Sequence, residues 1–452
     1  MKVTGLAANG RSRRRIASTL GRAVRRAAAL LAAAAAPAAL GAQDTAATAA
    51  DSLRARLEQL EEAVALLRQQ LAAQAAAEVR TRSRARLELL GRLAGTGFYA
   101  TRRLNNLDVP QLVLPAPPAD AGPAEGTLGA TFRQSLLGAA VSGVRVGGAE
   151  VSADVDLDFA GGSQAGSGGR GTFPVPRLRT ARAFLRGGLG ELMAGHEVPL
   201  VLGLNPVSIA STTTPLFSNA GNLWLWLTQA RVTRELLGGP CVEGGECGVR
   251  LALQTAVLAP NAGETLPNDP DAVDAAERAR RPFLQARARL AWGEEGEVGV
   301  GVHRGWLRQG TALRQGGAVG ADLRVPLGAF ELRGEAYRGR LLRGLGGGGV
   351  GQNFGTATLP LAPAPVLRDQ GGWAQLNVRV GEPWLGGAGC GVDDPENDDL
   401  AVRRRNLSCA AHLTWRPGGG WLVGAEAKRL GTEYATGTRW ASHGAVVMGV
   451  EF

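Results

Sequence analysis

Apolar and polar residues alternate along most of the chain of 452 residues. From Leu87 to Phe452 the alternation has a period of two over runs of about ten residues, which is typical of β-strands with two unlike faces. The clearest run sets Val151, Ala153, Val155, Leu157 and Phe159 against Ser152, Asp154, Asp156 and Asp158. This pattern predicts an all-β region over residues 87–452.

The connections between these runs are of two kinds. Short turns at 187–190, 293–296 and 417–420 alternate with long segments at 101–130, 161–176, 200–222, 260–281, 343–371 and 394–405. Short turns at one end and long loops at the other are typical of outer-membrane barrels. We therefore predict an antiparallel transmembrane β-barrel of about 16 strands, an even number that places both barrel ends on the periplasmic side.

A secreted soluble β-protein is the alternative to a barrel. Beyond the N-terminal segment, the chain has no run of the roughly 18 to 20 apolar residues that a membrane helix requires. The nine tryptophans favour the barrel, because most stand near strand ends, where an aromatic girdle forms at the two lipid–water interfaces. They are Trp224, Trp226, Trp292, Trp306, Trp373, Trp384, Trp415, Trp421 and Trp440. In a soluble protein they would lie at mid-strand in a core.

The last run ends in an aromatic residue at the final carboxylate. Counting back in twos from Phe452 gives an apolar row through Val450, Met448 and Val446. Such an ending resembles the signal recognised by the bacterial barrel-assembly machinery, which we therefore expect as a partner through Phe452.

A helical pattern precedes the barrel. Leu53, Leu57, Leu60, Val64, Leu67 and Leu71 recur at steps of four and three, the seam of a left-handed coiled coil. We predict a periplasmic coiled-coil helix over 43–78 and an Arg-rich linker over 79–86. A helix folded onto its own domain is the alternative, but so short a helix has little surface to cover, so oligomerisation is favoured.

Charge is concentrated at the N-terminus. The formal net charge is +10, and eight basic residues without any acid precede residue 43. Residues 1–42 also contain an apolar run, Ala27–Ala36, and a small-residue exit, so they predict a signal peptide. Without these eight charges the exported chain is nearly balanced at +2. The basic composition therefore does not indicate a nucleic-acid partner.

If the apolar residues at every second strand position face lipid, the residues at the alternate positions line the lumen. The basic residues among them are Arg133, Arg182, Arg186, Arg231, Arg287, Arg289, Arg324, Arg333, Arg379 and Lys428. The acidic ones are Asp154, Asp156, Asp158, Asp322, Glu331, Glu335 and Glu426. The acids gather on the third strand, whereas the fourth, sixth and eighth carry only bases, so we expect a transverse field across the pore. Wall-bracing ion pairs are the alternative for any one pair.

The sequence offers little catalytic chemistry. The glycine-rich run 344–349 satisfies a dinucleotide pattern but has no crossover helix after it, the four histidines have no metal-ligand spacing, and no nucleophile elbow is present. We therefore expect neither an enzyme nor a cofactor. The acidic segment 393–399 is interpreted as a solvated extracellular loop, with a calcium site or contact with lipopolysaccharide phosphates through bridging cations left open.

The four cysteines fall in two local pairs. Cys241 and Cys247 flank a predicted periplasmic turn, and Cys390 and Cys409 lie on opposing strands of one hairpin, on the apolar parity. In an oxidising periplasm these pairs predict two local disulfides.

The arrangement of signal peptide, short coiled coil, Arg-rich linker and barrel resembles the coiled-coil-tethered trimeric porins, the DcaP-like group and its phosphate-selective O/P relatives. Residues 131–138, 154–159, 177–181 and 192–196 stand in the order of that group's second to fifth strands. His196 departs from it, because the resemblance leads us to expect a glutamine contact in the pore there. The resemblance implies a homotrimeric passive channel of the outer membrane that favours small anions.

Two functions stay open at this point. The first is a diffusion porin for small hydrophilic, preferentially anionic solutes. The second is a structural tether, in which the coiled coil and linker hold the outer membrane to the peptidoglycan and conductance is incidental. In porins in general the third extracellular loop narrows the channel, and the apolar and hydroxyl composition of 200–222 suits packing against the wall. Whether this loop enters the lumen is left to the structure.

Overall fold

The computed structural model describes residues 79–80, 85–116, 125–161, 174–188, 190–238, 248–264, 273–359 and 362–452. The predicted signal peptide, the coiled coil and the Cys241–Cys247 pair lie outside these residues and stay predictions. No helix in the described part of the chain is long and apolar enough to cross a membrane.

The described chain is built almost wholly of strands. They are β1 (Val79–Arg80), β2 (Arg86–Ala100), β3 (Thr127–Thr131), β4 (Leu136–Val146), β5 (Ala149–Asp158), β6 (Arg177–Gly187), β7 (Gly190–Glu197), β8 (Leu227–Leu237), β9 (Arg250–Leu258), β10 (Phe283–Trp292), β11 (Gly296–Gln309), β12 (Ala312–Leu327), β13 (Phe330–Arg340), β14 (Arg368–Val380), β15 (Trp384–Pro395), β16 (Arg403–Gly418), β17 (Trp421–Tyr434) and β18 (Gly437–Glu451). The helical turns are η2 (Glu277–Ala279), η3 (Arg343–Leu345), α3 (Gly348–Gly351) and η4 (Asn397–Asp399).

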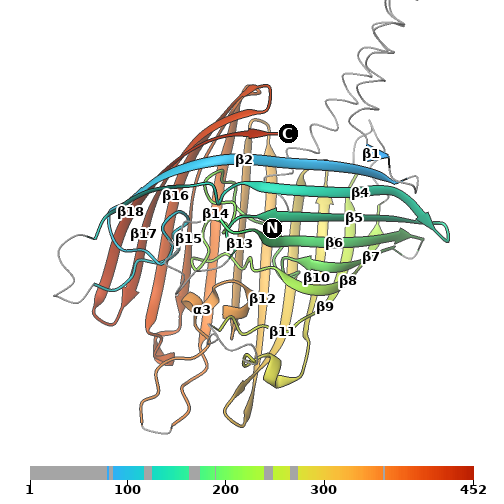
Figure 1. Ribbon diagram of the computed structural model, residues 1–452. Helices are drawn as coiled ribbons and strands as arrows, with labels where there is room; N and C mark the ends of the chain where they lie inside the picture. The colour runs from blue at the N-terminus through green and yellow to red at the C-terminus, as the bar shows by residue number, and fades with distance from the viewer. Residues whose placement is uncertain are drawn as a thin grey trace, which may run out of the picture. The chain divides into compact units, whose positions relative to one another are not determined.

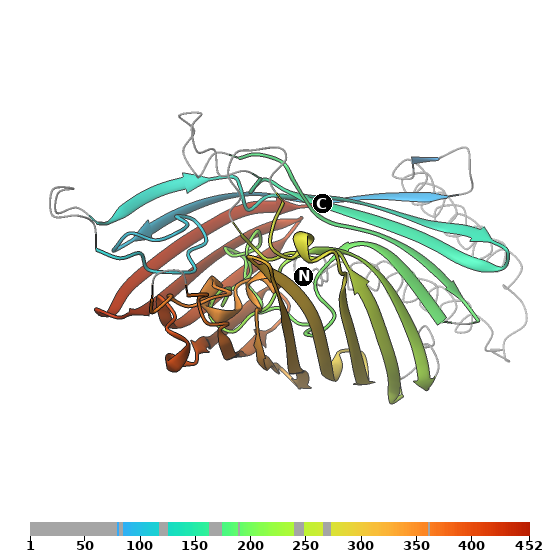
Figure 2. The ribbon, with the colours of Figure 1, turned by 90° about the horizontal axis from the view of Figure 1, so that it is seen from below.

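The strands close into one barrel, as Figures 1 and 2 show. Successive strands pair antiparallel, β9 pairs with β10, and β18 returns to β2 with Val450 opposite Leu93. Both β3 and β4 pair with β2, so they are two halves of one barrel strand. With β3 and β4 taken together and the two-residue β1 left aside, the wall has 16 strands. The predicted all-β antiparallel barrel of 16 strands is confirmed.

The start of the barrel differs slightly from the predicted boundary. Arg86, which we assigned to the linker, begins β2, and Val79 and Arg80 pair with Leu87 and Arg86. Backbone pairing therefore extends into the Arg-rich segment, which hydropathy alone marks as a linker.

Burial alternates along the strands because each strand has one face inside the barrel. On β11, Val300 and Val302 are 55% and 47% exposed on the outside, whereas His303 is buried. On β5, Asp156 and Asp158 are buried on the inner side. The outer face is thus apolar and the inner face polar, as expected for a wall whose backbone groups are all paired strand to strand.

The tryptophans divide between the two faces. Six lie on outward positions near strand ends, including the stacked pair Trp384 and Trp415, whose ring centroids are 5.7 Å apart. Trp224 and Trp226 are buried in the connection between β7 and β8, and Trp373 is buried on the inner face of β14. The predicted girdle is therefore wrong for these three residues, because a position near a strand end does not tell whether the ring points out or in.

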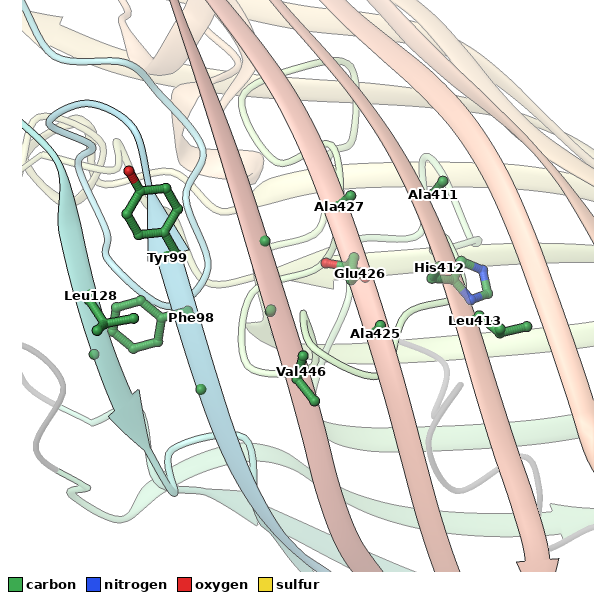
Figure 3. A pocket seen from close by; sticks show the side chains of 14 residues that line it. Phe98, Tyr99, Leu128, Ala411, His412, Leu413, Ala425, Glu426, Ala427 and Val446 are labelled. Carbon is green, nitrogen blue, oxygen red and sulfur yellow. The ribbon is translucent and has the colours of Figure 1, made fainter.

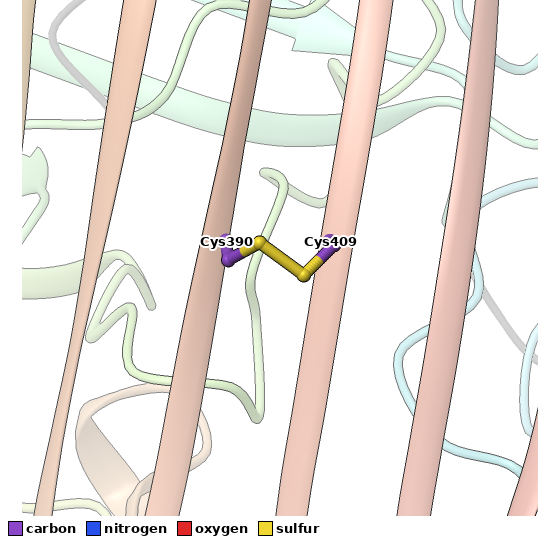
Figure 4. Close-up of a disulfide and its surroundings, with 2 residues drawn as sticks. All are labelled: Cys390 and Cys409. Carbon is purple, nitrogen blue, oxygen red and sulfur yellow. A yellow bond between two sulfur atoms is a disulfide. The ribbon is translucent and has the colours of Figure 1, made fainter.

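Strands β15 and β16 are joined by a disulfide between Cys390 and Cys409 (Figure 4). The two residues stand directly opposite each other in the ladder, with Cα atoms 4.0 Å apart. Neither is buried, and both have inward-facing neighbours, Gly391 and Ser408. The disulfide therefore lies on the outer face of the wall.

The outer wall is shallowly hollowed between β2, β3, β16, β17 and β18 (Figure 3). Small residues such as Gly97, Ala411, Ala425 and Gly444 line the hollow. Larger side chains, among them Tyr99, Leu128, Leu413 and Val446, frame it.

Candidate functional site

The connection between β7 and β8, residues 198–226, lies inside the barrel (Figure 2). Val201, Leu202 and Thr213 are at most 1% exposed, although they belong to a loop. By chain order this is the third of the connections at the long-loop end, after those that follow β2 and β5. The third loop thus enters the lumen, which answers the question that the sequence left open.

Inward-facing amide and carboxylate side chains fix the first half of this loop to the wall. Gln285 on β10 accepts the backbone N–H of Val201 at 3.1 Å. Glu335 on β13 accepts that of Leu204 at 2.6 Å, and its other oxygen accepts the indole N–H of Trp373 at 3.0 Å. These bonds satisfy backbone donors that have no partner within a strand.

The loop then follows the wall to β14 and β17. The Gln375 side chain accepts the N–H of Val207 and donates to the carbonyl oxygen of Val207, at 2.6 and 2.8 Å. Glu426 accepts the hydroxyls of Ser208 and Ser211 and pairs with Lys428 at 3.2 Å. A buried ion pair is tolerated here because the serine hydroxyls supply further hydrogen bonds.

Inward-facing glycines make room for the loop. A Cβ atom on Gly301 would lie 2.1 Å from the carbonyl oxygen of Val201, and one on Gly391 would lie 2.2 Å from that of Ala220. A Cβ atom on Gly320 would lie 2.6 Å from the Leu202 side chain, and one on Gly424 would lie 2.7 Å from the Ile209 side chain. No side chain fits at these positions, so the glycines form a seat for the third loop on β11, β12, β15 and β17.

The first loop, described over 101–116, also enters the barrel. Asp108 is fully buried and accepts Arg133 at 2.6 Å and Gln134 at 2.9 Å. Gln134 in turn binds the loop residues Thr212 and Thr213. Gln134 therefore joins the first loop to the third, and Arg133 anchors the first loop and does not line an open wall.

The third loop is uncharged. Between Val198 and Trp226 the sequence contains no Asp, Glu, Lys, Arg or His. Any electrostatic preference at this level of the lumen must therefore come from the wall.

The wall charges on β5 and β6 are paired. Arg182 binds Asp154 at 2.7 Å and also Glu197. Asp158 accepts both Nε and Nη2 of Arg177, at 3.0 and 2.6 Å, and Asp156 accepts the Thr180 hydroxyl. Bases on the fourth strand thus face acids on its neighbours, which weakens the transverse field expected from the sequence.

Arg287 and Arg333 lie beneath the third loop. Arg287 is 2% exposed, donates to Asp322 through Nε at 3.1 Å, and lies 3.6 Å from Glu297. A Cβ atom on Gly203 of the loop would lie 2.9 Å from its guanidinium carbon. Arg333 pairs with Glu331 and donates to the Asn205 carbonyl oxygen at 3.0 Å. Arg289 lies 3.7 Å from Glu297. Arg287 is therefore buried and ion-paired beneath the third loop, which favours a structural role over the predicted one in selectivity.

Arg231 on β8 is arranged differently. It is only partly buried and donates to the Val198 carbonyl oxygen and to Gln229, at 3.2 and 3.0 Å. Within the residues that the structure describes, no carboxylate forms an ion pair with it. Arg231 is therefore a predicted wall arginine that has hydrogen bonds but no ion pair within the described residues. Two other predicted wall arginines stand at the short-turn end of the barrel. They are Arg186, which pairs with Glu191 at 2.6 Å, and Arg379, which is exposed.

The acidic segment 393–399 does not converge on one point. Asp393 accepts the Val350 N–H at 3.0 Å, Glu396 pairs with Arg338, and Asp399 pairs with Arg368. In the described part of the chain, no group of three or more His, Cys, Asp or Glu residues is placed to hold a metal ion. The calcium interpretation is therefore not carried further.

His196 faces outward. Its neighbour Glu197 is buried inside, and the His196 ring lies 3.4 Å from the Thr228 hydroxyl on the adjacent strand. The pore contact expected at this position is wrong, because the alternation of β7 directs Glu197 to the lumen.

The sequence analysis missed the residues that hold the third loop. Gln134, Gln285 and Gln375 are uncharged, so a search for charges passes over them. Glycines at inward-facing strand positions could have indicated a loop inside the barrel, because glycine weakens a strand and often marks a place where another backbone approaches closely. These glycines are Gly301, Gly320, Gly391 and Gly424.

No protein-family model and no curated protein matches this chain. Several solved structures are similar to it. The outer-membrane channel DcaP of Acinetobacter baumannii aligns over 83% of this chain and 100% of its own, with 14% identity and a TM-score of 0.62. The anion-selective porin from Comamonas acidovorans aligns over 81% and 100%, with 12% identity and a TM-score of 0.54. The resemblance predicted from the sequence is confirmed for the fold, because the barrel of this chain is similar to the structures of these two outer-membrane proteins.

Proposed function

We propose that this protein is a passive diffusion channel of the bacterial outer membrane for small hydrophilic solutes and that it has no enzymatic activity. The observation that carries the proposal is an apolar-faced closed barrel whose interior is narrowed by a loop fixed to its wall at Gln285, Glu335, Gln375 and Glu426. A polar lumen with a constriction selects solutes by size and charge. Both similar solved structures carry channel or porin names.

We further propose a modest preference for anions. The third loop contributes no charge, and most wall arginines are neutralised by carboxylates on adjacent strands. Arg231, which forms no ion pair within the described residues, supplies positive charge, and Arg289, 3.7 Å from Glu297, supplies a weaker contribution. A fixed charge acts only over about 8 Å at physiological salt, so the preference depends on a narrow lumen.

The proposal includes a homotrimer with periplasmic coiled coils. The leucine seam of residues 43–78 supports the assembly. Phe452, on the outward apolar row of β18, supports insertion by the barrel-assembly machinery. Outer-membrane lipid and lipopolysaccharide would surround the wall, and peptidoglycan would be within reach of the basic linker.

Single-channel recording tests the proposal against the tether. Purified full-length protein in planar phosphatidylcholine bilayers is expected to give stepwise, ohmic current. Deleting Ser211–Phe217 should raise the conductance, because this segment spans from the Gln134 contacts to the Phe217–Trp373 ring contact inside the barrel. Gln134→Ala, which removes the bonds to Asp108, Thr212 and Thr213 but keeps the loop, should give a smaller increase and more current noise. A wild-type protein without current would favour the tether.

A further inference from the structure

A second hollow lies on the outer face of β7 to β10, at the long-loop end. Ala194, Ala230, Val257 and Ala259 line it, and Arg280 and Arg281 lie at its edge. Residues 194, 230, 257 and 284 are direct neighbours across four strands, so the floor is continuous. These side chains are exposed, whereas Met193, Gln229 and Leu258 between them are buried inside. The hollow therefore opens toward the lipid.

Arg280 and Arg281 line this hollow, and Arg304 stands on the neighbouring strand β11; we call these three residues the outer arginine cluster. Arg280 ends η2 with a φ of 54°, and the Arg281 guanidinium lies 5.7 Å from the centre of the Trp306 ring. Arg304 stands two residues before Trp306 on the same face of β11, opposite Leu284. All three are exposed.

The cluster has no ion-pair partner within the described residues. Among the residues that the structure describes, no Asp or Glu forms an ion pair with Arg280, Arg281 or Arg304. A guanidinium on the lipid face of a barrel is costly at the bilayer centre but tolerated at headgroup level. Guanidinium groups bind phosphate oxygens in a bidentate manner. The Trp306 ring marks the same interfacial level.

We propose that the outer arginine cluster and the adjoining hollow bind a phosphorylated outer-leaflet glycolipid of the lipid A class. The phosphate groups contact Arg280, Arg281 and Arg304, and an acyl chain lies along Ala194, Ala230 and Val257. Lipid A fits better than a glycerophospholipid because three separate guanidinium groups suit a headgroup with more than one phosphate. The assignment rests on the proposed outer-membrane function, which places the long-loop end at the outer leaflet.

Lipid binding to full-length protein in detergent micelles tests the phosphate contacts. Labelled lipid A should bind the wild type more tightly than dephosphorylated lipid A or phosphatidylglycerol. The triple variant Arg280→Gln, Arg281→Gln, Arg304→Gln should raise the Kd for lipid A by about tenfold or more, since hydrogen bonds to charged groups are the strong ones. Arg429→Gln is the matched control, because Arg429 also faces outward over a tryptophan ring, that of Trp440 at 5.4 Å.

Three outcomes would overturn the proposal. They are an unchanged Kd in the triple variant, an equal loss in Arg429→Gln, and equal binding of lipid A, dephosphorylated lipid A and phosphatidylglycerol by the wild type. Ala230→Trp fills the hollow and should also weaken lipid A binding, and unchanged affinity would contradict the acyl-chain placement. Conductance in phosphatidylcholine bilayers should be the same for all these variants. A wild type that binds lipid A without conducting would contradict the channel and not the lipid site.

Discussion

Gly301 on β11 and Val201 in the third loop approach so closely that a Cβ atom on the glycine would lie 2.1 Å from the carbonyl oxygen of Val201. The contact joins two backbones 100 positions apart in the sequence, and a similar contact occurs between Gly391 and the backbone of Ala220. The third loop is therefore seated in the wall, and its position depends on the absence of side chains.

Replacing Gly301 with leucine should displace the loop. The added side chain overpacks the contact with Val201, which typically destabilises by about 1–3 kcal/mol. We expect a lower unfolding midpoint in urea and an altered single-channel conductance. Gly97→Leu is the control, because an outward Cβ on Gly97 meets no atom within 4 Å. If Gly301→Leu behaves like Gly97→Leu in both measurements, the seat is not a constraint.

Arg287 should contribute to stability more than to selectivity. Arg287→Gln leaves Asp322 buried without its guanidinium partner and leaves Glu297 with an ion pair to Arg289 alone within the described residues, and breaking a buried pair costs about 3–5 kcal/mol. The double variant Arg287→Gln, Asp322→Asn should recover part of the loss, because it removes the unpaired charge at Asp322 as well. Urea unfolding of the two variants checks this. An unaltered unfolding free energy in Arg287→Gln would restore Arg287 as a free lumen charge.

Both cysteine pairs should be oxidised in protein taken from the outer membrane. The directly opposed Cys390 and Cys409 require no long-range pairing, and Cys241 and Cys247 are separated by only five residues. Mass spectrometry of non-reduced digests should find the two local cross-links. Free thiols at 390 and 409, or a bond between the two pairs, would contradict the register of the β15–β16 hairpin.

Polar substitutions of Leu57, Leu60, Val64 and Leu67 should weaken the trimer, because they remove the apolar seam of the proposed coiled coil. Native gels with increasing temperature measure trimer dissociation. Serine at Glu58, Glu62 and Gln69, the b and f positions of the predicted heptads, is the control. An unchanged dissociation temperature in the seam variant would mean that barrel contacts alone hold the trimer.

The barrel could be predicted from the sequence because each strand carries its own evidence. The alternation of Val151 to Phe159 is local, and lipid on one side enforces it residue by residue. The path of the third loop could not be predicted in this way, because it depends on contacts such as Gln375 to Val207 across 168 positions. The partners of Arg287 were equally hidden, since parity places Arg287, Asp322 and Glu297 on one face but does not show that they meet.

The zero-current potential in a salt gradient tests the central claim most directly. Wild-type channels in planar bilayers should show a modest anion preference. Arg231→Gln should shift the potential toward cation preference, because Arg231 is a wall arginine that forms no ion pair within the described residues. Arg338→Gln removes the same charge from a side chain that is 72% exposed and next to the inward Tyr337, so it should leave the potential unchanged. A cation-preferring wild type, or equal potentials for wild type and Arg231→Gln, would contradict the account.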